Sequence, residues 1–274
     1  MNETPTALGS WPNAPLALVL AQVRYAPTSD TAPDLVLERI KRAAGPQFSS
    51  TQNLHQITLM FGPIGQADAL PQHKAEDHGY NLRTQKNDEA FILNPGVFSF
   101  MTAAYVDSSH FAERWKSFMA ALFNGNELQI DRIGLRYIDF IIPSKGHVPE
   151  DYFQEIGRSP SSLGKQSEFA TSMFDFLRDD GGRLRVQYFR GEGDPELPPD
   201  LQGGVIIPAH RPRHHKGDAA GVLDMDRWRP VGMPLSSETT ADAIIALRED
   251  IARSFRNIMT ELAHREWAGL TARG

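Results

Sequence analysis

Short apolar runs and one amphipathic pattern organise the first part of the chain. Residues 16–27 and 54–63 are short, apolar and partly β-branched, which predicts two strands. Between them, 31–45 opens with a threonine and an early proline and closes on basic residues and a glycine, which predicts a helix. Within 88–106, two apolar runs flank an Asn-Pro-Gly turn sequence and therefore predict a hairpin.

The apolar spacing then changes from that of a strand to that of a helix. Phe111, Trp115, Phe118 and Leu122 follow one another at four, three and four residues, so they share one helix face. Residues 130–143 return to the pattern of a strand. The order strand, helix, strand, hairpin, helix, strand is close to a ferredoxin-like unit with an extra strand.

The second half of the chain combines long polar connections, further strands and the clearest helix. Residues 183–191, 204–209 and 221–228 predict strands. Thr239 and Asp242 resemble the capping pair of a long closing helix. The apolar residues of that helix, spaced three or four apart, are Ile244, Leu247, Ile251, Phe255, Ile258 and Leu262.

Together these elements predict an α+β protein with a mainly antiparallel sheet. Residues 1–143 form the ferredoxin-like part, and residues 144–274 form a second, β-rich part that ends in the C-terminal helix. We expect the two parts to pack together as one unit.

Composition restricts the classes of function. The 274 residues are 41% apolar and 23% charged, which is ordinary for a globular domain. Because the chain contains no cysteine, thiolate catalysis, disulfides and Cys-ligated metal sites are excluded. The net charge of −6 argues against a general nucleic-acid coat and leaves only a local basic patch open.

Hydrophobic segments of membrane-spanning length are missing from the sequence. No apolar run approaches roughly 18 residues, and the N-terminal segment lacks the basic and apolar regions of a signal peptide. We therefore expect a cytoplasmic protein with no membrane contact.

Several of these segments resemble a known family when they are taken together. They are VFSFMTAAYVDSSHFAERWKSFM at 97–119, RIGLRYIDFIIP at 132–143, VLDMDRW at 222–228 and the closing helix. The chain is similar in them to a sporadically distributed family of uncharacterised bacterial proteins, most specifically in Arg-Ile-Gly-Leu-Arg-Tyr. The resemblance implies one intact unit with an accessory role, and it implies no particular activity, cofactor or catalytic residue.

The segment PAHRPRHHKGD at 208–218 is the densest in reactive side chains. Pro212 separates His210 from His214, so a helical metal-binding pair of histidines is disfavoured. In an extended loop the basic side chains could meet phosphate or carboxylate groups, and a solvated connection between strands is the commoner alternative. The anion-binding candidates in this segment are Arg211, Arg213, His214, His215 and Lys216.

A second candidate anion site lies on the strand at 130–142. Two-residue alternation places Arg132, Gly134 and Arg136 on one face, where the glycine leaves room for a ligand or a backbone to approach. The commoner use of such arginines is pairing with acidic side chains on a neighbouring strand.

Two aspartates on the strand at 221–228 are weak metal candidates. Asp224 and Asp226 project from one face, and carboxylates two residues apart could hold Mg²⁺. No His or Glu spacing supplies the remaining ligands, so no cofactor is expected beyond this weak case for Mg²⁺. Solvent-facing aspartates, or partners for Arg132 and Arg136, are the alternatives.

Common catalytic and nucleotide-binding motifs are missing from the sequence. The stretch HKAEDH at 73–78 fits neither His-Glu-x-x-His nor its inverse, and it is interpreted as a charged loop. There is no G-x-G-x-x-G, no Walker lysine and no G-x-S-x-G. The aromatic residues within 98–118 have strand and helix spacings, which favours core packing over base stacking.

The sequence therefore favours a non-catalytic binding or assembly protein of a bacterial accessory system, such as a defence or mobile-element system. A protein partner or self-association is expected, with local phosphate or nucleic-acid contact left open. The alternative is a metal-dependent phosphodiesterase or a nucleic-acid-binding protein, in which the arginines hold phosphates. That alternative requires the arginines and aspartates to converge on one concave surface.

Overall fold

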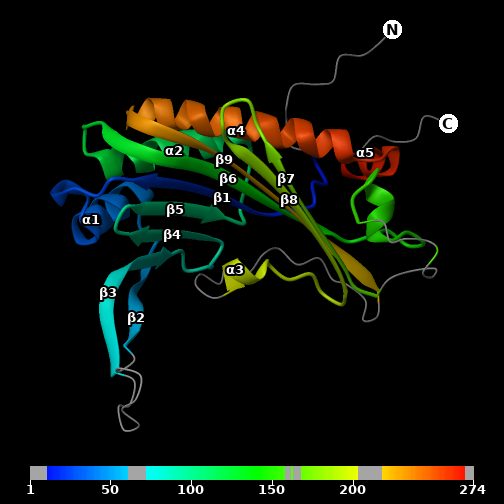
Figure 1. Ribbon diagram of the computed structural model, residues 1–274, viewed down its shortest axis with the longest axis horizontal. Coiled ribbons are helices and arrows are strands. Elements are labelled where there is room, and N and C mark those ends of the chain that lie inside the picture. Colours follow the sequence, from blue (N-terminus) through cyan, green and yellow to red (C-terminus); the bar gives the residue numbers. More distant parts are fainter. Residues whose placement is uncertain (1–10, 61–71, 158–161, 163–167, 203–217, 269–274) are drawn as a thin grey trace.

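One large antiparallel sheet dominates the computed structural model, in which residues 11–60, 72–157, 162, 168–202 and 218–268 are described. Of residues 55–60 and 72–77 only the backbone belongs to that description. Nine strands follow the order β2-β3-β4-β5-β1-β6-β9-β8-β7. Helices α2 and α4 cover one face of this sheet, and α3 lies on the opposite side (Figure 1).

The strands vary from short hairpin arms to one of seventeen residues. They are β1 (Leu16–Tyr25), β2 (Ser50–Met60), β3 (Gln72–Arg83), β4 (Glu89–Asn94), β5 (Val97–Thr102), β6 (Leu128–Ile141), β7 (Ala170–Leu177), β8 (Arg183–Glu192) and β9 (Ala219–Leu235). The helices are α1 (Pro33–Ala44), α2 (Ser108–Phe123), α3 (Pro199–Gln202), α4 (Ser237–Ile258) and α5 (Glu261–Trp267), with 3₁₀ turns at Ser29–Thr31 and Pro149–Tyr152.

The α+β class, the large antiparallel sheet and the C-terminal helix are confirmed. The ferredoxin-like arrangement is not: residues 1–143 supply β1 to β6, which are neighbours in a longer sheet. Strand β6 pairs along its length with β9, from Leu128 opposite Leu235 to Ile141 opposite Gly221. The two halves of the chain therefore share one sheet, while a domain division at 143 stays a prediction.

Aromatic side chains form the centre of the core between the sheet and α2. Phe91, Phe98 and Phe100 from the β4–β5 hairpin lie against Trp115 and Phe118 of the helix, and all are buried. The rings of Phe91 and Phe118 meet edge to face with centroids 4.6 Å apart, a favoured aromatic geometry. Core packing of these aromatics is thus confirmed.

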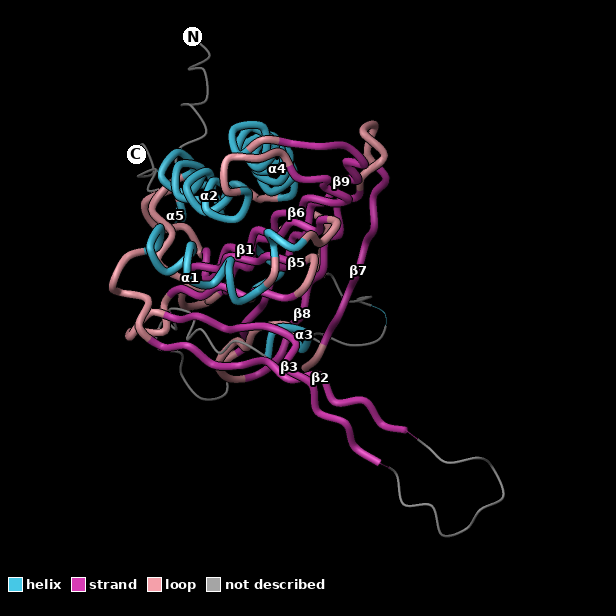
Figure 2. The backbone as a smooth tube through the Cα atoms, turned by 90° about the vertical axis from the view of Figure 1, so that its left-hand side faces the viewer, coloured by secondary structure: helices cyan, strands magenta, loops and turns pink. Residues whose placement is uncertain are grey.

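The charged stretch at 73–78 is a strand rather than the loop that its composition predicted. It belongs to β3, which pairs antiparallel with β2 over the whole length of β2. Figure 2 shows the β2–β3 hairpin projecting away from the rest of the sheet. Backbone pairing holds polar residues in extended conformation there, since strand preference depends on context more than on residue type.

The closing helix begins earlier and ends sooner than its apolar spacing predicted. Ser236 is its N-cap and its hydroxyl accepts a hydrogen bond from the Thr239 backbone N–H, so Thr239 already lies in the first turn. The helix stops at Ile258, and Thr260 caps the separate helix α5. The spacing of apolar residues does not reveal such a break, because the apolar face continues across it.

Within the described part of the chain, no helix has the length and apolar character needed to cross a membrane.

Candidate functional site

The candidate arginines of β6 lie on the face of the sheet opposite α2 and α4. Ile133 and Leu135 belong to the core beneath the helices, whereas Ile138 belongs to a second apolar cluster on the other face. Two-residue alternation then places Arg132 and Arg136 on the same side as Ile138. The face assignment made from the sequence is confirmed.

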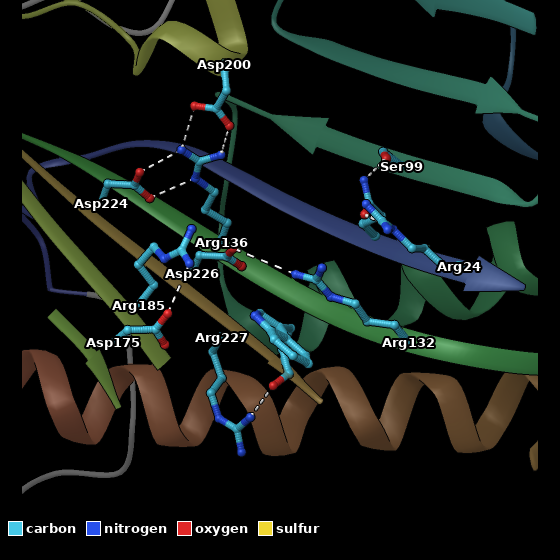
Figure 3. A network of polar contacts seen from close by, with 12 residues as sticks. Arg24, Ser99, Arg132, Arg136, Asp175, Arg185, Asp200, Asp224, Asp226 and Arg227 are labelled. Carbon is cyan, nitrogen blue, oxygen red and sulfur yellow. Dashed lines mark hydrogen bonds and ion pairs between the residues drawn. The ribbon is translucent and has the colours of Figure 1, made fainter. Parts of the chain in front are cut away.

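Arg136 is held by two carboxylates in a bidentate manner. Its Nε and Nη2 donate to Oδ1 and Oδ2 of Asp224 at 2.8 and 2.6 Å. Its Nη1 and Nη2 donate to the two carboxylate oxygens of Asp200 at 2.5 and 3.0 Å. Figure 3 shows the guanidinium enclosed between the two acids. Of the two uses open to this arginine, pairing across strands is the one observed.

Short helix α3 brings Asp200 to this site. Leu201 packs on the second apolar cluster, so that α3 rests on the sheet and its acid meets Arg136. Hydrogen bonding from Arg136 lowers the pKa of Asp200. Burial alone would lower the pKa of Arg136, but the bonds to both aspartates raise it overall, so the guanidinium stays charged.

Arg132 has a looser environment on the same face. Its guanidinium lies 4.0 Å from Asp226 and 4.3 Å above the ring of Trp228. A Cβ at Gly134 would lie 3.3 Å from the Cβ of Trp228. The space beside this glycine, expected to admit a ligand or a backbone, is therefore occupied by the neighbouring strand, through the Trp228 side chain and the Arg227 and Trp228 backbone.

Asp224 and Asp226 share a face but have different partners. Asp224 is only 1% exposed and binds Arg136, which corrects the expectation of a solvent-facing pair. Burial raises the pKa of Asp226, and the nearby charges of Arg136 and Arg132 oppose this effect. Across the described residues, no three His, Cys, Asp or Glu side chains are grouped so that they could hold a metal ion. The two aspartates are thus partners of the arginines.

The basic loop candidates cannot be added to this picture. Arg211, Arg213, His214, His215 and Lys216 lie outside the described residues. Their role in anion binding stays a prediction.

Sequence reasoning missed a second feature, the exposed apolar strand β7. This strand lies at one end of the sheet and, among the described residues, pairs only with β8. Met173, Phe174, Phe176 and Leu177 are 60, 43, 48 and 72% exposed. The run of β-forming apolar residues before Gly181 and Gly182 was the available signal for a strand.

The apolar side chains of β7 lie on both faces of the sheet. Asp175 shares the polar face with Arg185 of β8, whose Nη2 donates to it at 3.0 Å. Phe174 and Phe176 lie on the opposite face with their rings stacked, 6.3 Å between centroids. The described helices leave both rings exposed. A strand that has one edge without a partner among the described strands, and exposed apolar side chains on both faces, is suited to binding another protein surface.

The polar face and the β7 edge together define what this region can do chemically. On the polar face, Arg136 and Asp224 are bound to each other, so neither is poised as a free acid, base or metal ligand. At the edge, main-chain groups and apolar side chains are presented side by side. Such a surface supports recognition of another chain.

Comparisons with protein-family models, curated proteins and solved structures found no match to this chain.

Proposed function

We propose that this is a non-catalytic assembly protein that associates with a second copy of itself through β7. The proposal extends the sequence-based expectation of a cytoplasmic binding or assembly protein in a bacterial accessory system. The observation that carries it is the exposure of the β7 apolar side chains at the end of a nine-stranded sheet. Natural proteins usually cover, charge or shorten such an edge, so an edge that no described element covers indicates a pairing site.

The charge pattern of β7 favours a second copy as the occupant. Asp175 is the single charged residue of the strand, and Arg185 and Arg183 of β8 lie 3.0 and 3.6 Å from it. Two β7 strands can therefore approach without an uncompensated charge on either. When two β7 strands pair antiparallel about a two-fold axis, equivalent faces of the two sheets lie side by side. Phe174 and Phe176 of one copy then lie next to the same residues of the other copy. The sheet would continue from one copy into the next.

The test is the mass of the protein in solution. We expect a dimer of the 30.5 kDa chain by light scattering, and a monomer when Phe174 and Phe176 are both replaced by lysine. The matched control is Leu35→Lys, at a 55% exposed position on α1, which should remain dimeric. Hydrogen exchange should also show that the β7 amides become protected as protein concentration rises.

Two results would overturn this proposal. One is a wild-type chain that stays monomeric at the highest attainable concentration. The other is a double lysine variant that remains as dimeric as the Leu35 control, because the contact would then lie elsewhere. Each result concerns β7 alone.

The metal-dependent phosphodiesterase and the nucleic-acid-binding protein stay predictions from the sequence. No observation on the polar face favours either of them over assembly, because Arg136 is already occupied by two carboxylates. Binding of a labelled single strand that weakens steeply with salt would favour the nucleic-acid reading.

A further inference from the structure

A cavity of about 400 Å³ lies between the helix-covered face of the sheet and the second half of α4. The segment before β1 and the residues that follow β5 complete its walls. The residues that matter to its chemistry are Trp11, Tyr105, Tyr137, Asp139, Arg248 and Phe255. Its volume falls within the range of small-molecule sites in proteins.

Asp139 is the unusual group in this cavity. It lies on β6, is only 4% exposed and lines the cavity. Among the described residues no backbone or side-chain donor hydrogen bonds to its carboxyl group, although Asp224, one strand away, has two bonds from Arg136. Burial, with a smaller contribution from the charge of Asp224, raises the pKa of Asp139 to about 8. A buried carboxyl without a partner is costly, and it indicates a group that is supplied from outside.

The opposite wall of the cavity is positively charged. Arg248 and Arg256 of α4 both line it. Tyr137 donates a hydrogen bond to the Tyr105 hydroxyl at 3.1 Å, and Arg248 hydrogen bonds to both tyrosines. This arrangement holds a guanidinium and two hydroxyl groups at the cavity surface, which suits a carboxylate.

Aromatic side chains provide an apolar part of the cavity wall. The ring of Trp11 lies 5.6 Å from that of Phe255, and the Phe255 ring stacks on Trp267 at 6.1 Å. Trp11 is partly buried against the core, so its position is fixed by packing. An apolar body of a ligand would be covered here.

We propose that this cavity binds a small zwitterionic molecule of the amino-acid class, with its ammonium group on Asp139, its carboxylate on Arg248 and its apolar body against Trp11 and Phe255. A simple anion would leave Asp139 without a partner. A simple cation would meet the charges of Arg248 and Arg256. A molecule that carries both charges can place its ammonium group on Asp139 and its carboxylate on Arg248. The cavity is separate from β7.

The experiment is titration calorimetry with probes that share a ring system and differ in charge. L-tryptophan and L-phenylalanine are the zwitterions, tryptamine is the cation and indole-3-propionate is the anion. We expect at least one of the two amino acids to bind, and to bind about tenfold or more tightly than either singly charged probe, because the anion offers Asp139 no donor and the cation offers Arg248 no carboxylate.

Substitutions then assign the binding to this cavity. Asp139→Asn keeps the shape of the side chain and should weaken amino-acid binding about tenfold or more. The matched control is Asp131→Asn, an exposed position on the same strand, which should leave binding unchanged. Ala252→Phe, at a half-exposed position on α4 that lines the cavity, should abolish binding by filling the space. Circular dichroism establishes that each variant is folded.

Three results would overturn the inference. They are the absence of binding by both amino acids, equal binding by indole-3-propionate and the amino acids, and unchanged binding in a folded Ala252→Phe variant. If Asp139→Asn fails to fold, the Ala252 variant and the probe series still decide the question.

Discussion

Two buried aspartates on neighbouring strands have opposite surroundings. Asp224 of β9 and Asp139 of β6 are 1% and 4% exposed, and the charge of Asp224 acts on Asp139. Asp224 lies on the polar face, where Arg136 binds both of its oxygens. Asp139 lies on the helix-covered face and lines a cavity, with no hydrogen-bond donor in the described residues.

The difference shows that burial of a carboxyl group does not define its role. With a bidentate partner, a buried aspartate fixes how two strands and α3 pack together. Without a partner, the same group reduces stability, and proteins place such groups where function needs them. The polar face is therefore the structural site, and the cavity is the functional candidate.

The largest expected effect comes from removing the partner of Asp224. Arg136→Met leaves that carboxylate buried and unpaired, and should lower the free energy of unfolding by about 3–5 kcal/mol. Urea unfolding measures this loss. In the double variant with Asp224→Leu, most of the lost stability should return, because an apolar pair replaces the broken ion pair. A single variant as stable as wild type would contradict the structural role of the pair.

At neutral pH, Asp139→Asn should raise the free energy of unfolding, whereas Arg136→Met should lower it. In the native state the pKa of Asp139 is raised from 3.8 to about 8, so the carboxyl group keeps its proton up to about pH 8. In the unfolded chain the same group loses its proton at about pH 4. The free energy of unfolding therefore falls as pH rises from about 4 to about 8. At pH 7 the substitution should stabilise the protein by about 2–4 kcal/mol.

Thermal unfolding across pH tests this sign. The gain in stability should disappear below pH 4, where both states keep the proton. Asp131→Asn is the matched control, since that residue is exposed on the same strand. A variant that is less stable than wild type at pH 7 would show that Asp139 has a stabilising partner.

The smallest effect is expected on the looser side of the polar face. Arg132→Gln removes a half-exposed ion pair at 4.0 Å and a contact with the Trp228 ring. We expect a loss of about 0.5–1 kcal/mol in urea unfolding, and the loss should shrink as salt is added. A loss of unfolding free energy as large as that of Arg136→Met would contradict this prediction, because Arg132 would then contribute as much to stability as Arg136.

The sequence predicts the polar face better than the cavity. Alternation along β6 places Arg132 and Arg136 correctly, because a strand has a two-residue period wherever it lies in a sheet. The sequence also left open that Arg136 pairs with Asp224. The register between β6 and β9 was the one further fact needed to choose this alternative. Local pattern thus predicts a contact between adjacent strands.

Asp139 could not be recognised in the same way. In the sequence it is one polar residue within an apolar strand, and nothing near it shows which groups will face it. Its cavity is built from Trp11, from the residues after β5 and from α4, which lie far apart along the chain. The position of β7 at the sheet edge was equally hidden, since strand order depends on tertiary packing.

The pairing of β6 with β9 also bears on how the chain emerges during synthesis. Strand β6 ends at Ile141, and its partner begins only at Ala219. A nascent chain that has folded β1 and β6 thus exposes β6 as a temporary edge until β9 is made. Arg132 and Arg136 then have no aspartates opposite them, and their charges oppose pairing of that edge with other nascent chains. The arginines that pair with aspartates in the finished sheet thus place positive charge beside this temporary edge.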